Sequence, residues 1–192
     1  MSTDNCRGDF LWYELMSKDP NGSVAFYPGV TGWTTTAMPN PMGGGDYLMF
    51  ANEGAPFAGC MKLPPEAEAM QAPSHWMGYI GTPDVDATVA QATALGASVY
   101  MPPTDIPSVG RMAVLADPQG GTFSVFCPAP REGDPQPQPK APIAWHELMT
   151  SDIEAAGRST PRFSAGRRST TSTWARWACT ACLARAPSRS AA

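Results

Sequence analysis

The sequence predicts an α+β fold that consists of two successive βαβββ units, with the helices on one side of the sheet. Short runs rich in apolar and β-branched residues recur over the first 128 residues, separated by Gly, Pro, Asn or Asp. Only two segments carry helical signals, and each follows the first strand of its group. The order of elements then repeats after Pro64-Pro65. We expect the free faces of the two units to curl together around a cavity.

The first unit begins with an aromatic-rich strand at residues 10–16, which ends at the turn residues 18–22. A short helix follows within residues 24–33, although Pro28 and Gly29 weaken it. Three strands complete the unit at residues 34–38, 46–51 and 57–63. The tripeptide Asn52-Glu53-Gly54 predicts a hairpin between the last two.

The second unit starts with a strand at residues 76–81. Residues 85–95 have apolar side chains at helical spacing, and Asp84 and Gly96 are suitable N-cap and C-cap residues. Three strands follow at residues 98–101, 111–116 and 122–127, with a turn at residues 117–121 between the last two.

The chain divides into four regions. Residues 9–128 form the two-unit module, and residues 129–142 are a proline-rich linker. Residues 143–157 begin a second copy of the module, because residues 145–152 (WHELMTSD) match residues 12–19 (WYELMSKD) at a constant offset of 133. Residues 158–192 hold seven arginines and no acidic residue, and we expect a disordered basic tail there.

A shifted reading frame explains the composition of this tail. Trp174-Ala175 and Trp177-Ala178, read across their codon junctions, each encode glycine in the other frame. With GC-rich codons, the tail can be read as a sequence that repeats the Phe-Tyr, Gly-Trp and Pro-Met-Gly order of residues 26–43. Our hypothesis is that a frameshift near residues 156–158 interrupted the second copy.

Composition argues against several classes of function. The first 157 residues carry 17 acidic against six basic side chains, whereas nucleic-acid binding needs a basic surface. No apolar run is long enough to span a membrane, and no secretory signal is visible. The five cysteines are irregularly spaced, so we expect free thiols in the cytosol. The sequence therefore predicts a soluble cytoplasmic protein that binds neither nucleic acid nor membrane.

Three motifs carry a family resemblance: WYELMSKD followed by AFY and GW, the segment HWMGYIGTPDVDATVAQATALGA, and the hairpin MAVLADPQGGTFSVF. Together they resemble the vicinal-oxygen-chelate superfamily, which has the glyoxalase, bleomycin-resistance and dihydroxybiphenyl-dioxygenase fold. They are particularly similar to the tandem-module, glyoxalase-like "hydroxylase" proteins of actinobacteria. The resemblance covers about two-thirds of the chain. It implies paired βαβββ units around a small-molecule site.

The resemblance also implies positions for metal ligands. In metal-dependent members, His, Gln or Glu side chains from the first and last strands of each unit hold one divalent ion, which binds two vicinal substrate oxygens. The matching positions are Trp12, Met77 and Ser124, and the strand at residues 57–63 offers only Cys60. These side chains do not make a divalent oxygen and nitrogen site, so we expect no metal and no other cofactor.

Other side chains are candidates for lining a ligand pocket. Glu14 shares a strand face with Trp12, where it could carry a proton or orient a cationic ligand, with structural hydrogen bonding as the alternative. His75 shares a face with Met77, as a pocket acid–base or as a polar residue at the strand entrance. The remaining candidates, which core packing also explains, are Tyr47, Cys60, Tyr79 and Phe126. No residue is assigned a catalytic role.

The sequence favours metal-independent binding of a small molecule of unknown identity by the glyoxalase-like module. One alternative is a metal-dependent lyase, isomerase or dioxygenase. Another is a non-functional, truncated two-module protein. The sequence leaves open whether a reaction is catalysed and whether the chain forms a homodimer through its exposed module interface.

Overall fold

The computed structural model describes residues 6–43, 45–130, 142–152 and 154–156, and the structural statements below concern these residues. The first half of the module contains β1 (Phe10–Ser17), α1 (Pro20–Thr31), β2 (Thr34–Pro39), β3 (Asp46–Asn52) and β4 (Ala55–Lys62). The second half contains α2 (Pro65–Ala69), β5 (His75–Gly81), α3 (Val85–Ala94), β6 (Ser98–Ile106), β7 (Gly110–Ala116) and β8 (Thr122–Pro128).

Helix α1 begins earlier than the sequence analysis predicts. The carboxylate of Asp19 accepts a hydrogen bond of 3.0 Å from the Gly22 backbone N–H, and Pro20 occupies the first helical turn. Proline is favourable there because the first N–H groups of a helix have no partner within the helix. The residues that we predicted to form a turn are therefore the start of the helix. The predicted hairpin is confirmed, since Glu53 and Gly54 both have positive φ angles, 51° and 79°.

The second half matches its prediction more closely, with one extension. Asp84 caps α3 as predicted, because its carboxylate accepts from the Ala87 N–H at 2.9 Å. Strand β6 continues through Pro102 and Pro103 to Ile106. Prolines are tolerated there because β6 is an edge strand that pairs only with β7, and the pairing register shifts around them. The short helix α2 was not predicted.

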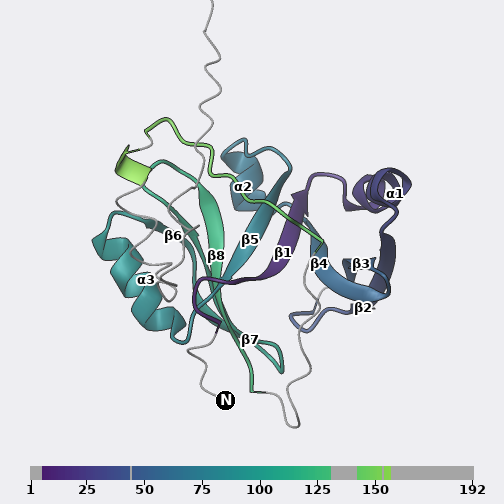
Figure 1. Ribbon diagram of the computed structural model, residues 1–192, viewed down its shortest axis with the longest axis horizontal. Helices are drawn as coiled ribbons and strands as arrows, with labels where there is room; N and C mark the ends of the chain where they lie inside the picture. Colours follow the sequence, from purple (N-terminus) through teal and green to yellow (C-terminus); the bar gives the residue numbers. More distant parts are fainter. Residues whose placement is uncertain (1–5, 44, 131–141, 153, 157–192) are drawn as a thin grey trace, which may run out of the picture.

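All eight strands form one sheet in the order β2-β3-β4-β1-β5-β8-β7-β6. Each half contributes four neighbouring strands, and the halves join through the antiparallel pairing of β1 with β5. This arrangement confirms the predicted α+β fold of two βαβββ units. Helices α1 and α3 lie at opposite flanks of the sheet (Figure 1), and neither they nor α2 is long and apolar enough to cross a membrane.

The two longer helices cover the same face of the sheet, which we call the helix face. Apolar clusters lie under each helix: Tyr13, Leu15, Phe50, Phe57, Ala58 and Cys60 near α1, and Val85, Ala92, Ala97, Ala113, Leu115 and Val125 near α3. The strand register places both clusters on one side of the sheet. Tyr13 pairs with Gly78 on β5, and Ile80 lies two residues further along β5, on the same face as Gly78. Ile80 in turn pairs with Val125 on β8.

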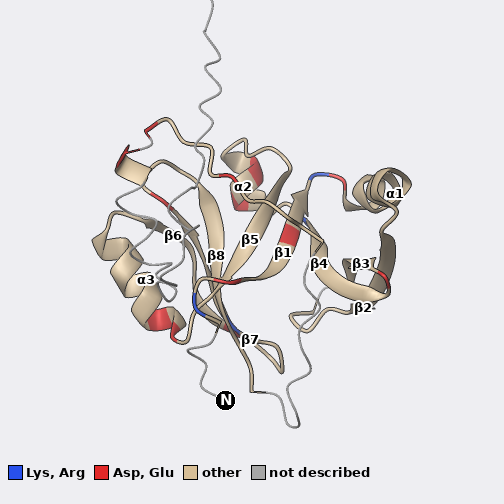
Figure 2. Ribbon diagram, in the orientation of Figure 1, with Lys and Arg blue, Asp and Glu red and all other residues tan. Residues whose placement is uncertain are grey.

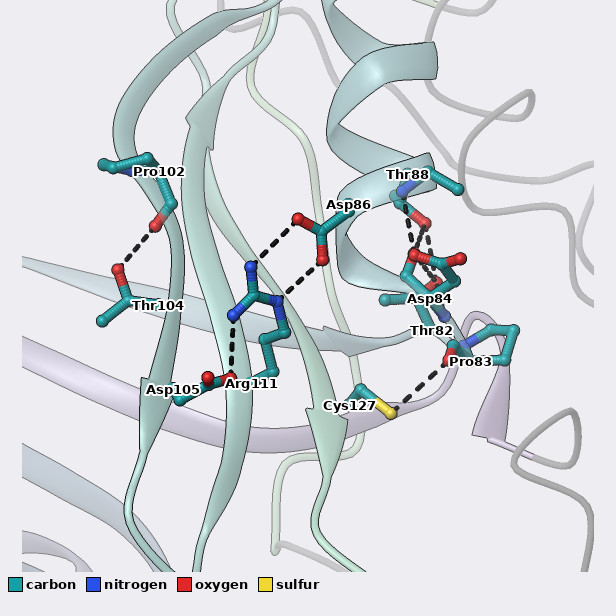
Figure 3. A network of polar contacts seen from close by, with 11 residues as sticks. Thr82, Pro83, Asp84, Asp86, Thr88, Pro102, Thr104, Asp105, Arg111 and Cys127 are labelled. Carbon is teal, nitrogen blue, oxygen red and sulfur yellow. Dashed lines mark hydrogen bonds and ion pairs between the residues drawn. The ribbon is translucent and has the colours of Figure 1, made fainter.

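An ion-pair network also links α3 to the helix face (Figure 3). The Arg111 guanidinium on β7 donates from Nε and Nη2 to the Asp86 carboxylate at 2.7 and 3.0 Å. It also donates from Nη1 to Asp105 on β6 at 2.8 Å. Beside it, the Thr82 and Thr88 hydroxyls lie 2.7 Å apart at the first turn of α3. The ion pairs are largely exposed and add little to stability, so apolar burial under α3 supplies most of the stabilisation.

The repeated motif does not adopt the same structure twice. Residues 12–17 lie in β1, whereas residues 145–152 form no strand. Instead, the His146 ring stacks on Phe10 with centroids 3.8 Å apart, and its Nε2 lies 2.6 Å from the Tyr13 hydroxyl on the helix face. That this segment begins a second module stays a prediction. Residues 131–141 of the predicted linker and the predicted tail at residues 158–192 lie outside the described residues.

Candidate functional site

The face of the sheet opposite the helices, the open face, brings together most of the predicted pocket residues. Residues that pair directly across neighbouring strands point to the same face of the sheet. Glu14 on β1 pairs with Met77 on β5, and Tyr79 on β5 pairs with Ser124 on β8. Eight of the nine candidates therefore lie on this face: Trp12, Glu14, Tyr47, His75, Met77, Tyr79, Ser124 and Phe126. Cys60 does not, because it pairs with Leu15 and packs in the cluster near α1. Burial raises the pKa of the Cys60 thiol to about 11.

A directed chain of hydrogen bonds joins three of these side chains. The Trp12 indole Nε1–H donates to the Tyr47 hydroxyl at 3.0 Å, and that hydroxyl donates to Glu14 Oε2 at 2.7 Å. The direction follows from chemistry, because an indole can only donate and a tyrosine hydroxyl has one hydrogen. The second carboxyl oxygen, Glu14 Oε1, is buried and has no hydrogen-bond partner in the described part of the chain.

Gly59 on β4 makes this contact possible. It pairs with Glu14 on β1 and with Met49 on β3, so it lies on the open face between the two strands that carry the hydrogen bond. A Cβ atom at Gly59 would overlap both the Tyr47 hydroxyl and Glu14 Oε1. Only glycine leaves room for the tyrosine to reach across β4 to the carboxyl group.

Burial determines the protonation of Glu14. The residue is only 2% exposed and is the one acidic residue in the sequence of β1, a strand that Figure 2 shows partly in the red of Asp and Glu. Removal from water raises its pKa from 4.5 to about 8, although the nearby Tyr47 hydroxyl and Trp12 N–H both work in the opposite direction. The pKa values of Tyr47 and Tyr79 are also raised, first by burial and then by the Glu14 carboxylate. At neutral pH the group is therefore predominantly an uncharged carboxylic acid.

The surroundings of Glu14 are apolar and rich in methionine. Met77, Tyr79 and Met112 are buried in one cluster, and its partly buried members are Trp12, Met16, Met101, Ile106, Val114 and Phe126. The Tyr79 and Phe126 rings meet edge to face at a centroid distance of 6.1 Å. In the strands of the described residues, the only Lys and Arg side chains are Lys62 and Arg111, and both lie on the helix face. The face can thus accommodate apolar surface, and the Glu14 carboxyl group and the Tyr79 hydroxyl are among its few polar groups.

The residues at the family's metal-ligand positions do not fit a divalent ion. Trp12 has no metal-binding atom, and the Met77 thioether is a soft donor. The Ser124 hydroxyl is fully buried and already donates to the Ala113 carbonyl oxygen at 2.9 Å. In the described residues, no three His, Cys, Asp or Glu side chains come close enough together to hold a metal.

His75 lies at the start of β5, where it is partly exposed. Its Nδ1 lies 2.8 Å from the Pro73 carbonyl oxygen, so one ring nitrogen is held by the backbone two residues earlier. This geometry corresponds to the polar residue at the strand entrance that the sequence suggested as one of two alternatives.

Sequence reasoning missed two residues of the site. Gly59 has no side chain to suggest a role, and the search of its strand for ligand-type side chains found only Cys60, its neighbour on the other face. Met112 on β7 faces Phe126 on β8 and lies in the buried methionine cluster. Strand alternation identifies the faces of β7 but not its neighbours, so only the register could have brought Met112 to the site.

Comparison with known proteins relates the chain to glyoxalase-like proteins. Residues 13–126 match the model of a family described as "Glyoxalase-like domain". The chain is 42% identical over 128 residues to "Putative glyoxylase CFP32" of Mycobacterium tuberculosis, covering 67% of this chain and 47% of that protein. It is 34% identical over 155 residues to "Anthracycline biosynthesis protein DnrV" of Streptomyces peucetius, covering 76% and 56%. The chain thus spans about half the length of these relatives.

Solved structures with a similar arrangement are more distant in sequence. A methylmalonyl-CoA epimerase from Streptomyces coelicolor is 19% identical, with a TM-score of 0.46, over 63% of this chain and 97% of the epimerase. A hypothetical protein from Bacillus halodurans is 12% identical, with a TM-score of 0.49, over 66% and 98%.

Proposed function

Because the chain belongs to the glyoxalase-like family of the vicinal-oxygen-chelate superfamily, we propose that its open face binds a small, largely apolar molecule without the help of a metal ion. Sites for small molecules are typically apolar surfaces with a few well-placed polar groups. The methionines and aromatic rings around Glu14 have this composition.

One observation carries the proposal: a carboxyl group is buried under this apolar surface with one oxygen unpartnered. An unpartnered buried polar atom costs about 1–3 kcal/mol of stability, and an apolar side chain of similar size would avoid that cost. Such a group calls for an explanation beyond folding. A ligand atom that pairs with Glu14 Oε1 provides one.

The donor chemistry at Trp12, Met77 and Ser124 supports binding without a metal. The name of the S. peucetius relative, which refers to anthracycline biosynthesis, is compatible with a small-molecule ligand. The activity of the longer relatives is not carried over, because this chain spans only about half of them.

The test is a calorimetric titration of the full chain with uncharged aromatic compounds, with and without EDTA. We expect saturable binding that EDTA does not change, and that Phe126→Ala weakens. The matched control is Phe26→Ala, which removes an exposed phenylalanine from α1 and should leave affinity unchanged. Absence of saturable binding would refute the proposal, and so would binding that requires a stoichiometric divalent metal.

Three further expectations from the sequence remain proposals: a cytoplasmic location, a homodimer through the module interface, and a frameshift near residues 156–158. Resequencing the gene across these codons tests the last. An uninterrupted frame, with no insertion or deletion relative to an intact relative, would refute it.

A further inference from the structure

The inference concerns the class of ligand, and it rests on the proposed function of the open face. We propose that Glu14 acts there as a hydrogen-bond donor through Oε1, and that the ligand is an uncharged molecule with a carbonyl-type oxygen that accepts this bond. The argument starts from the direction of the hydrogen bonds rather than from the identity of any relative.

The chain of donors determines which carboxyl oxygen carries the proton. Tyr47 accepts the Trp12 N–H with an oxygen lone pair and donates its own hydrogen to Glu14 Oε2. Oε2 is thereby the accepting, carbonyl-like oxygen of a neutral carboxyl group. The acidic hydrogen then belongs on Oε1, the oxygen without a partner. A neutral Glu14 therefore presents one donor that has no partner among the described residues.

The groups that face Glu14 favour the neutral form. From β3 it faces the hydroxyl of Tyr47, from β5 Tyr79 and the more distant His75, and from β4 and β8 the uncharged Gly59 and Ser124. Cys60 of β4 points to the helix face. The described strands place no Lys or Arg on the open face to compensate a carboxylate, which agrees with the raised pKa of Glu14.

The same composition discriminates among ligands. An anion would meet no Lys or Arg from the described strands on the open face and would face Glu14. A cation would first require the buried acid to ionise. A neutral molecule with an acceptor oxygen satisfies the free donor without creating a charge, and its apolar surface can contact the methionines and aromatic rings.

Access requires a small movement. Glu14 Oε1 is shielded from solvent and lies beside Gly59 on β4, and methionines of the open face such as Met77 surround the carboxyl group. A methionine side chain is unbranched and changes rotamer readily, so it can move aside for a ligand oxygen at low cost.

The experiment compares four planar probes that share one hydrocarbon framework. Fluorenone has an acceptor oxygen, fluorene has none, fluorene-9-carboxylate is an anion, and 9-aminofluorene is a cation when protonated. Affinities are measured by calorimetry with the full chain at pH 6.5 and pH 9.5. We expect fluorenone to bind about tenfold more tightly than fluorene at pH 6.5, the effect of one buried hydrogen bond. The preference should disappear at pH 9.5, where Glu14 has lost its hydrogen.

Three variants separate donation from packing. Glu14→Gln should keep the fluorenone preference at both pH values, because its amide nitrogen is a permanent donor while its amide oxygen can still accept from Tyr47. Glu14→Leu should show no preference at either pH. Tyr79→Phe should leave the pH dependence unchanged, since a tyrosine donor would not lose its hydrogen between these two pH values.

Several results would overturn the inference. The first is that the anion or the cation binds more tightly than fluorenone. The second is that the unmodified chain still prefers fluorenone to fluorene at pH 9.5. The third is that Glu14→Gln loses this preference. If that variant does not fold, the affinities of the unmodified chain for the four probes at the two pH values still test the inference. Failure of all four probes to bind would instead refute the proposed function, and this inference with it.

Discussion

The protonation of Glu14 predicts how the stability of the module depends on pH. In the unfolded chain this carboxyl group has its ordinary pKa of 4.5, and in the folded protein its pKa is about 8. Between these values the folded protein retains a proton that the unfolded chain has lost. The free energy of unfolding must therefore fall as the pH rises from about 4.5 to about 8. The two pKa values correspond to a total loss of at most about 5 kcal/mol.

Replacing Glu14 by Gln removes the titration and keeps a side chain of nearly the same shape. We expect the stability of the variant relative to the unmodified protein to increase steadily from pH 5 to pH 8 and then to level off. The measurement is urea unfolding followed by tryptophan fluorescence at each pH, with equal slopes against urea in both proteins. Glu66→Gln is the matched control, because it removes an exposed carboxylate in α2.

Parallel pH profiles of the unmodified protein and Glu14→Gln would refute the reasoning. So would a stability of the unmodified protein that rises, relative to the variant, between pH 5 and pH 8. Either result would mean that Glu14 is ionised in the folded state and that a group compensates its charge. The neutral donor on the open face would then have no physical basis.

Three other substitutions test the geometry of the site and of the helix face. Tyr47→Phe leaves the Trp12 N–H and Glu14 Oε2 unpartnered, and should lower the free energy of unfolding by about 1–3 kcal/mol; Tyr100→Phe, at an exposed tyrosine, should not change it. Gly59→Ala places a methyl group against Tyr47 and Glu14 and should cost about 1–3 kcal/mol in urea unfolding. Gly29→Ala, where nothing lies within 4 Å of the added atom, should be neutral or slightly stabilising, and equal losses in both variants would contradict the clash. His146→Ala removes the ring that stacks on Phe10 and should increase protease cleavage within residues 142–152 several-fold, whereas Trp145→Ala, at an exposed residue, should not.

Local signals predicted much of the fold because they act over a few residues. The cap at Asp84 and the hairpin at Glu53-Gly54 depend on backbone geometry within one turn, and both were recognised. The start of α1 was missed because Asp19-Pro20 is compatible with a turn as well as with a helix N-terminus. The extension of β6 was missed because prolines usually end a strand, and only its edge position in the sheet permits them.

The site was only partly predictable for a related reason. Alternation along β1 placed Glu14 and Trp12 on one face, as the structure confirms. It could not show that Cys60 faces the helices while Gly59 faces Glu14, because that depends on how β4 pairs with β1. The partner of the carboxyl group, Tyr47, comes from a strand that does not even neighbour β1.

The sequence by itself predicted that the module has two βαβββ units and that Glu14 lies on the free face of the first strand. It also has Trp12, Met77 and Ser124, which are not ordinary metal ligands, at the positions that the family resemblance implies for such ligands. These conclusions depend on periodicity and on the chemistry of single residues. Only the tertiary structure decided that Tyr47 donates to Glu14 across Gly59, that Oε1 is left without a partner, and that methionines from three other strands, β5, β6 and β7, enclose the site. Contacts across strands follow from register, and register is set by the packing of the whole sheet rather than by any one segment.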